Sequence, residues 1–372
     1  MKKLNINNIL VPIDFSERSI RAIATAKSLA QRFQSTVHLL NIQEPFYPVM
    51  FYGTGAPVPI APFETGEELR KSAAERLKAL AKENGLTGRR EAVMGTPVFN
   101  EICAIAKQIP TDLIVTPTHG RTGLKHVFLG STAERLVQHS PCPVFVLRKG
   151  GSHSHGKSSS PMNTILVPVD FSSCSLAGLE YAIAFAERVA ARIIVFHALD
   201  LGYAYTADGY AIYDLSRLQD AAREGAEAQM KKFIRTARFG SVKFETAIAI
   251  GPPVWEICEF AEKRDVDLII SATHGWTGFK HVLIGSTAEQ VVRHAPCSVL
   301  IAPSHSRIRT TNSTQPRVSK RTRKTASKDR KTRRVGSRPQ RFARRYRLPI
   351  ATPFPERRKT NKFRETHASK AR

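Results

Sequence analysis

The chain has 372 residues, 42% of them hydrophobic and 24% charged, and this length suggests two or three domains of ordinary soluble composition. No apolar run reaches the roughly 18–20 residues that a membrane-spanning helix needs, and polar residues interrupt any signal-peptide core near the start, so we expect a cytoplasmic protein. The formal net charge is +26, but residues 303–372 hold 24 Lys or Arg against 3 Asp or Glu, so most of the charge belongs to a basic tail.

Short runs of β-branched residues alternate with helical patterns in the first half of the chain. Residues 9–13 form a continuous apolar run that is typical of a buried parallel strand, and Ser16 would cap the helix that follows. Further strands are expected at residues 36–42, 90–94, 113–116 and 144–147, with helices at 64–84, 98–108 and 132–139. The segment 44–62, rich in Pro and Gly, is expected to be a loop.

The same order of elements returns about 155 residues later. The run N-I-L-V-P-I-D-F-S that begins at residue 8 returns as N-T-I-L-V-P-V-D-F-S from residue 163, and T-H-G-R-T-G-L-K-H at 118–126 returns as T-H-G-W-T-G-F-K-H at 273–281. Strands of the second copy are expected near residues 164–169, 192–198, 242–249, 268–272 and 298–302. Such a repeat is a tandem duplication of a domain. Its alternating strands and helices predict two doubly wound, five-stranded parallel α/β domains of Rossmann-like type.

We expect the first domain at residues 1–149 and the second at 162–303, joined by a flexible Gly/Ser linker at 150–161. The tail, residues 304–372, is poor in aliphatic side chains, so we expect it to be disordered. Basic tails bind polyanions, which makes nucleic acid or an anionic membrane surface a candidate partner. The alternatives are a solubilising appendage and a gene-end artefact. The fifth strands, 144–147 and 298–302, are the expected surface for pairing.

The five cysteines are an odd number and none of them lies in a C-x-x-C pair. That pattern argues against a disulfide framework and predicts no metal site. Cys103 and Cys258 lie on an apolar helical face, while Cys142 and Cys297 follow a proline just before the fifth strand. We expect these four cysteines to be small core residues.

A glycine loop that joins the fourth strand to the next helix is the most informative motif. The loop residues are Gly120, Gly130 and Ser131 in the first repeat and Gly275, Gly285 and Ser286 in the second. Ser131 and Glu134 form an S-x-x-E capping box, which predicts Ser131 as the helix N-cap. A helix N-terminus presents N–H groups and a positive dipole end to an anion. The loop is therefore a candidate phosphate site, and the alternative is a turn and a cap without a ligand.

Asp14 and Asp170 stand at the end of the first strand of each repeat. Two interpretations stay open: an acceptor for ribose hydroxyls or an adenine amine, or a helix cap shared with Ser16 or Ser172. The sequence contains no G-x-S-x-G, no H-E-x-x-H, no Walker A loop and no G-x-G-x-x-G after the first strand. We therefore predict no catalytic residues.

The motifs V-P-x-D-F-S, T-H-G-x-T-G-x-K-H, G-S-T-A-E and P-C-P-V-x-V together resemble the universal stress protein family, over about residues 1–302. The resemblance implies a five-stranded parallel α/β fold, and in tandem members the second domain can supply a dimer-like partner. One branch of the family binds ATP through the pattern G-x2-G-x9-G-[ST]. Carried onto this chain, the nucleotide-binding positions are Asp14, Ile42, Gly120, Gly130, Ser131 and Thr132, and Asp170, Ala198, Gly275, Gly285, Ser286 and Thr287.

The first glycine of that pattern is replaced in both repeats, by Pro117 and by Ala272. Proline has no N–H to donate and fixes φ, whereas alanine only adds a Cβ. The resemblance therefore supports nucleotide binding less in the first repeat than in the second.

The resemblance implies a non-enzymatic stress-response regulator that binds ATP, with Mg²⁺, or another adenine nucleotide at these loops, and that has protein partners or self-associates. Two alternatives stay open. One is a partner- or nucleic-acid-binding stress protein without nucleotide, targeted by its basic tail. The other is a slow ATPase or phosphotransferase.

Overall fold

The computed structural model describes residues 4–44, 49–51, 57–59, 66–118, 129–148, 162–201, 215–272 and 285–302. These residues belong to one compact unit, Met1–Ser313. The predicted linker, the predicted tail and the glycine-loop segments 119–128 and 273–284 lie outside the described residues. Among the described helices, none has the length and apolar character needed to cross a membrane.

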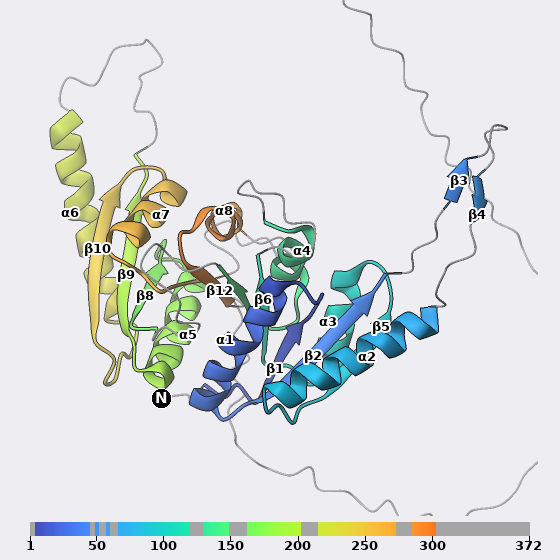
Figure 1. Cartoon of the computed structure of the whole chain (residues 1–372). Coiled ribbons are helices and arrows are strands. Elements are labelled where there is room, and N and C mark those ends of the chain that lie inside the picture. The colour runs from blue at the N-terminus through green and yellow to red at the C-terminus, as the bar shows by residue number, and fades with distance from the viewer. Residues whose placement is uncertain are drawn as a thin grey trace, which may run out of the picture. The chain divides into compact units, whose positions relative to one another are not determined.

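Each repeat forms five parallel strands with helices on both faces (Figure 1), which confirms the predicted fold class. The first repeat contains β1 (Asn8–Pro12), α1 (Glu17–Phe33), β2 (Thr36–Gln43), α2 (Gly66–Glu83), β5 (Arg90–Met94), α3 (Val98–Gln108), β6 (Leu113–Pro117), α4 (Ser131–His139) and β7 (Val144–Leu147). The second contains β8 (Thr164–Pro168), α5 (Ser173–Val189), β9 (Arg192–Leu199), α6 (Leu215–Ile234), β10 (Phe244–Ile250), α7 (Pro253–Lys263), β11 (Leu268–Ala272), α8 (Ser286–His294) and β12 (Ser298–Ala302).

The two repeats share one ten-stranded sheet, in the order β10-β9-β8-β11-β12-β7-β6-β1-β2-β5. Strands are parallel within each repeat, and the single antiparallel contact of this sheet joins the two fifth strands. There Phe145 is opposite Leu300, and Val146 is opposite Val299. The strands that were expected to be a pairing surface therefore pair with each other, and neither is left as an edge of the sheet.

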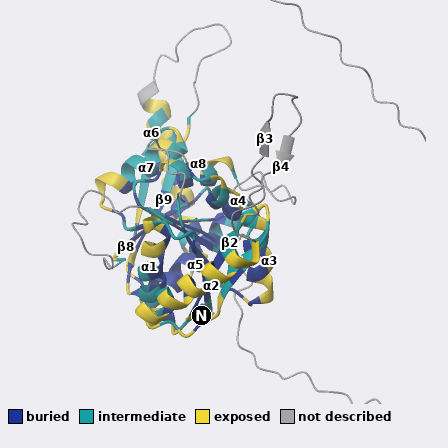
Figure 2. Ribbon diagram, turned by 45° about the vertical axis from the view of Figure 1, so that its right-hand side comes forward, coloured by how far each residue is buried: buried dark blue, intermediate teal, exposed yellow. Residues whose placement is uncertain are grey.

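One hydrophobic core continues from the first repeat into the second on the face that carries α1, α2, α5 and α6. Phe33 of α1 and Phe185 of α5 lie with their ring centroids 5.3 Å apart, and Arg32 donates from Nη1 to the carbonyl of Val189 at 2.8 Å. Figure 2 shows buried residues along the sheet and exposed ones on the outer helix surfaces. Because the core is continuous, we expect the two repeats to unfold together.

The segment expected to be a loop contains two short strands, β3 (Val49–Phe51) and β4 (Pro57–Pro59), which form a separate antiparallel pair. The prediction of an irregular loop was wrong for these residues. The run V-M-F consists of residues that favour strands, and the prolines of β4 are tolerated because each strand of a two-stranded sheet is an edge.

Aspartates that precede β6 and β11 fix the start of the first strand in each repeat. Asp112 Oδ2 accepts the backbone N–H groups of Asn7 and Asn8 at 2.8 and 3.0 Å. Asp267 Oδ2 does the same in the second repeat, with both distances 2.9 Å. A carboxylate that accepts two backbone N–H groups is a strong, charge-assisted staple, and it holds the register of β1 and β8 against their neighbours.

The close contact between α5 and β11 depends on Gly178. A Cβ at Gly178 would lie 3.1 Å from Ala272 Cβ and 3.3 Å from Ala272 N. We expect Gly178→Ala to lower the free energy of unfolding by about 1 kcal/mol or more, because the backbone of β11 must move. Gly225 on α6 has no atom within 4 Å of such a Cβ, so Gly225→Ala should raise it by about 0.5–1 kcal/mol. Urea unfolding measures both, and an equal gain at the two positions would refute the contact.

A buried histidine on β2 should make the stability depend on pH. His38 Nδ1 accepts the N–H of Arg89 at 3.0 Å, and its Nε2 lies 3.0 Å from Asn8 Oδ1, so the ring is held neutral. Burial, and then the charge of Arg89, lowers the pKa of His38 below 6.5. As the pH falls below about 6.5, the unfolded chain takes up this proton before the folded chain does, so stability falls.

We expect the urea midpoint to decrease between about pH 6.5 and 5, and to decrease less steeply in His38→Gln, which lacks the titrating group. The difference between the two pH profiles removes the contribution of the other histidines. Identical slopes in both proteins would show that His38 titrates alike in the folded and unfolded chains.

Candidate functional site

The candidate site of the first repeat lies where neighbouring parallel strands end. The strands β1, β2 and β6 are adjacent, so their carboxyl ends meet at one edge of the sheet. The Gly130 N–H donates to the carbonyl of Thr118 at 2.7 Å, so the glycine loop begins and ends at the same point above this edge. Gly120 and Gly275 lie outside the described residues.

The two strand-one aspartates order the turns that start α1 and α5. Asp14 Oδ1 accepts from the backbone N–H and the hydroxyl of Ser16, at 2.9 and 2.6 Å. The Ser16 hydroxyl in turn caps α1 by accepting the Ser19 N–H at 3.2 Å. Asp170 and Ser172 repeat this arrangement, with distances of 3.1 and 2.6 Å. The cap shared with Ser16 and Ser172 is therefore confirmed, and a contact of these carboxylates with a nucleotide stays a prediction.

The residue after each aspartate has a left-handed backbone, which the sequence did not predict. The φ angles are 61° at Phe15 and 63° at Phe171, a region that costs a residue with a side chain roughly 1–2 kcal/mol. Packing holds both rings in place: the guanidinium of Arg76 lies 3.8 Å from the Phe15 centroid, and Phe171 packs 4.3 Å from His197. Because phenylalanine is not a left-handed residue type, only the repetition of D-F-S could have drawn attention to this turn.

The residue before the predicted base-contacting position, on β2 or β9, makes a hydrogen bond to the turn that contains Asp14 or Asp170. Asn41 donates from Nδ2 to the carbonyl of Ile13 at 2.7 Å. His197 Nδ1 lies 2.8 Å from the carbonyl of Val169, at the equivalent place. Ile42 and Ala198 themselves are half-buried and pair with Val93 and Ala249 on the outer strands. These positions lie near the carboxyl ends of β2 and β9, and their contact with a base stays a prediction.

The N-cap prediction for Ser131 was wrong, because Gly130 is the N-cap of α4 and Ser131 is its first residue. Gly285 likewise caps α8. In the described structure, no side chain caps the start of either helix, so the first-turn N–H groups have no acceptor from a cap residue. The capping box fails because Glu134 is the fourth helical residue, one position beyond the place that a box requires. Its carboxylate pairs instead with Arg293, with 2.5 Å between Oε1 and Nη2.

The hydroxyl residues of the motif occupy the first turns of α4 and α8. Ser131, Ser286 and Thr287 are exposed, and Thr132 is half-buried. At the positive end of the helix dipole, free backbone N–H groups and adjacent hydroxyls can donate hydrogen bonds to phosphate oxygens. The departures from the family pattern are located in the strands: Pro117 is the last residue of β6, and Ala272 is the last residue of β11.

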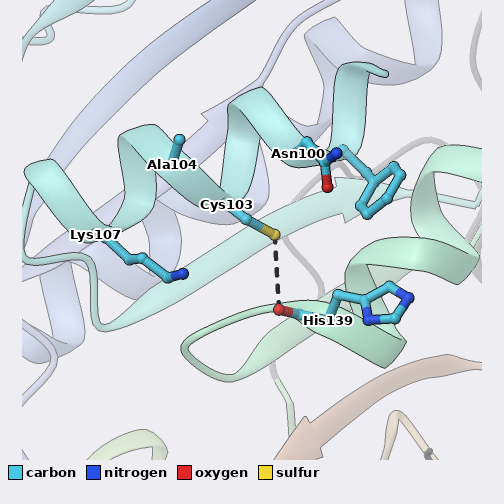
Figure 3. A pocket seen from close by; sticks show the side chains of 6 residues that line it. Asn100, Cys103, Ala104, Lys107 and His139 are labelled. Carbon is cyan, nitrogen blue, oxygen red and sulfur yellow. Dashed lines mark hydrogen bonds between the residues drawn. The ribbon is translucent and has the colours of Figure 1, made fainter. Parts of the chain in front are cut away.

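A shallow cavity of about 360 Å³ lies between α3 and α4 (Figure 3). Its lining consists of Phe99, Asn100, Cys103, Ala104, Lys107 and His139. The Cys103 thiol donates to the carbonyl of His139 at 3.8 Å, and burial raises the pKa of Cys103. Burial also raises the pKa of Cys142 and of Cys297 to about 12. Because the raised pKa favours the thiol over the thiolate, these cysteines stay protonated at neutral pH.

The structure defines a tandem α/β protein in which one helix of each repeat starts at a glycine N-cap, without a side-chain cap, at the carboxyl edge of the sheet. The model of the universal stress protein family matches residues 5–148 and 162–303. The chain belongs to the universal stress protein family.

Relatives from one archaeon match one repeat length of this chain. Universal stress protein MJ0531 of Methanocaldococcus jannaschii is 33% identical over 137 residues, which cover 37% of this chain and 79% of that protein. Universal stress protein MJ0577 of the same organism is 29% identical over 150 residues, which cover 37% of this chain and 92% of that protein.

Solved structures of two-repeat length share the fold. The functionally unknown protein PA1789 from Pseudomonas aeruginosa PAO1 has a TM-score of 0.54 at 20% identity, over 80% of this chain and 92% of that one. A universal stress protein from Archaeoglobus fulgidus has a TM-score of 0.51 at 19% identity, over 81% and 97%.

Proposed function

We propose that this universal stress protein is a non-enzymatic regulatory module that binds ATP or another adenine nucleotide at the carboxyl edge of its sheet. The observation that supports this most is the start of α4 and α8. Each helix begins at a glycine N-cap, with no side-chain cap and with hydroxyl residues in its first turn. Each is preceded by a strand that lies next to β1 or β8, the strand that ends two residues before Asp14 or Asp170.

Different residues bind the three parts of the proposed nucleotide ligand: the ribose, the base and the phosphates. The carboxylates of Asp14 and Asp170 accept ribose hydroxyls, and the backbone at Ile42 and Ala198 contacts the base. Backbone N–H groups and side-chain hydroxyls of the glycine loop and the following helix start hold the phosphates. The residues are Gly120, Gly130, Ser131 and Thr132 in the first repeat, and Gly275, Gly285, Ser286 and Thr287 in the second. This arrangement places the negatively charged phosphates at the positive end of the helix dipole, and the hydroxyl-accepting carboxylates at the ends of the strands.

Magnesium would enter with the nucleotide. The described residues include no group of three or more His, Cys, Asp or Glu side chains that could hold a metal ion. Mg²⁺ commonly binds through phosphate oxygens and water with few protein ligands, so exposed hydroxyls such as Ser131 and Ser286 fit a nucleotide-borne ion.

The second repeat is the stronger site. Ala272 has a backbone N–H and a φ that no ring fixes, whereas Pro117 lacks the N–H and has its φ fixed by the pyrrolidine ring. Titration of the full-length chain with ATP and Mg²⁺ by calorimetry tests the proposal. Saturable binding supports it, and the absence of binding heat together with an unchanged melting temperature leaves a partner-binding module. The purified chain can also be assayed for ATP hydrolysis. Hydrolysis that persists unchanged in the variant Gly130→Ala plus Gly285→Ala would come from a contaminating enzyme.

A second function, nucleic-acid binding, is supported by the charge of residues 304–372, which include 24 Lys or Arg and 3 Asp or Glu. Binding through such a segment releases counterions, so the affinity should fall steeply with salt. Unchanged DNA and RNA affinity after deletion of residues 304–372 would eliminate this function.

A further inference from the structure

One arginine connects the two glycine-started helices across the repeats. Arg293, in the last turn of α8, places Nη2 2.5 Å from Glu134 Oε1 of α4 and 3.0 Å from Glu289 Oε1 of its own helix. The three side chains are only 25–26% exposed. Charges that are partly shielded from water interact more strongly than a pair on the open surface. The two glutamates are equivalent residues, each three positions after Ser131 or Ser286.

A second arginine, from the first repeat, holds the same C-terminal end of α8. The guanidinium of Arg148, just after β7, donates to the carbonyls of Arg293 and Ala295, and the Arg148 N–H donates to Ser298 Oγ at 3.3 Å. A cation at these carbonyls complements the negative end of the helix dipole. The C-terminal end of α8 is therefore held by two residues of the first repeat, Glu134 and Arg148.

The opposite helix has no such arrangement in its sequence. Gln138 occupies on α4 the position that Arg293 occupies on α8, and Pro303 stands at the position equivalent to Arg148. Glutamine carries no charge and proline has no donor. The connection between the repeats is thus asymmetric: residues of the first repeat hold the helix that forms the phosphate site of the second.

We propose that Arg293 is a positioning residue that couples the two candidate phosphate sites, so that the affinity of the second repeat depends on the charge at the first. This inference rests on the proposed nucleotide binding. The guanidinium contacts the first-turn glutamates of both helices and neutralises two carboxylates that would repel an incoming phosphate. An anion at the start of α4 competes for the guanidinium of Arg293 and so weakens the ion pair between Arg293 and Glu289.

The test measures the ATP affinity of the second site in the full-length chain by calorimetry, for four proteins: the unaltered chain, Ser131→Asp, Arg293→Gln and the double variant. The carboxylate of Ser131→Asp supplies a permanent negative charge at the start of α4, whether or not that repeat binds nucleotide. We expect Ser131→Asp to weaken the second site about threefold or more when Arg293 is present and to leave it unchanged in Arg293→Gln. Arg293→Gln alone should weaken it about fivefold or more.

Gln138→Ala, at the equivalent position of α4, is the matched control and should change nothing. Arg293→Lys keeps the charge and should retain at least part of the coupling, which separates coupling from a loss of folding. An equal effect of Ser131→Asp in both backgrounds, or an unchanged affinity in Arg293→Gln, would overturn the inference while nucleotide binding itself stands. No binding by the unaltered chain would overturn the proposed function and this inference together.

Discussion

Ser286→Asp is expected to weaken adenine-nucleotide binding in the second repeat by about 100-fold, because a carboxylate at the first position of α8 competes for the same N–H groups and repels the phosphates. Aspartate is favourable in the first turn of a helix, so the fold should be retained. Calorimetric titration of the full-length chain with ATP and Mg²⁺ measures the affinity, and circular dichroism checks the melting temperature.

Ser286→Ala is the matched control for this prediction. It removes the hydroxyl without adding charge and should cost about tenfold or less, the value of one hydrogen bond. If Ser286→Asp bound nucleotide as tightly as Ser286→Ala, the start of α8 would not be the phosphate site.

Phe185→Ala should lower the free energy of unfolding by about 3–5 kcal/mol, because it leaves a large cavity in the core that the two repeats share. Phe185 is completely buried, and its ring packs against Phe33 of the other repeat at 5.3 Å. Urea unfolding of the full-length chain, followed by circular dichroism, should show one transition that moves to lower urea as a whole.

Trp255 provides the control for Phe185, since it is a larger aromatic residue that is 68% exposed. Trp255→Ala should change the free energy of unfolding by less than about 0.5 kcal/mol, as is usual for surface positions. Two separate transitions, of which Phe185→Ala shifts only one, would show that the repeats fold independently.

Most of the fold could be predicted from the sequence, because the signals that specify it are local. The predicted strands at 90–94, 268–272 and 298–302 agree with β5, β11 and β12 residue for residue, and helix 98–108 agrees with α3. Buried parallel strands are continuous apolar runs, and amphipathic helices repeat every 3.6 residues. Both patterns are visible within a single element.

The features that the sequence did not reveal depend on contacts between distant residues. Glu134 matches a capping box, but its carboxylate pairs with Arg293, which is 159 positions away. The choice of Gly130 over Ser131 as the N-cap follows from the backbone angles of the loop end, which no spacing rule encodes. Phe15 adopts a left-handed backbone because packing compensates for its cost. Each feature lies in the candidate site or beside it.

The measurement that tests nucleotide binding most directly is the amount of adenine nucleotide carried by the purified full-length chain. The protein is denatured, and the released small molecules are quantified by ion-exchange chromatography against nucleotide standards, with an ATP titration of the same preparation. We predict about one adenine nucleotide per chain, lost in Ser286→Asp, because Pro117 weakens the first site. An empty chromatogram together with no binding in the titration would contradict the account and make the starts of α4 and α8 simple helix ends.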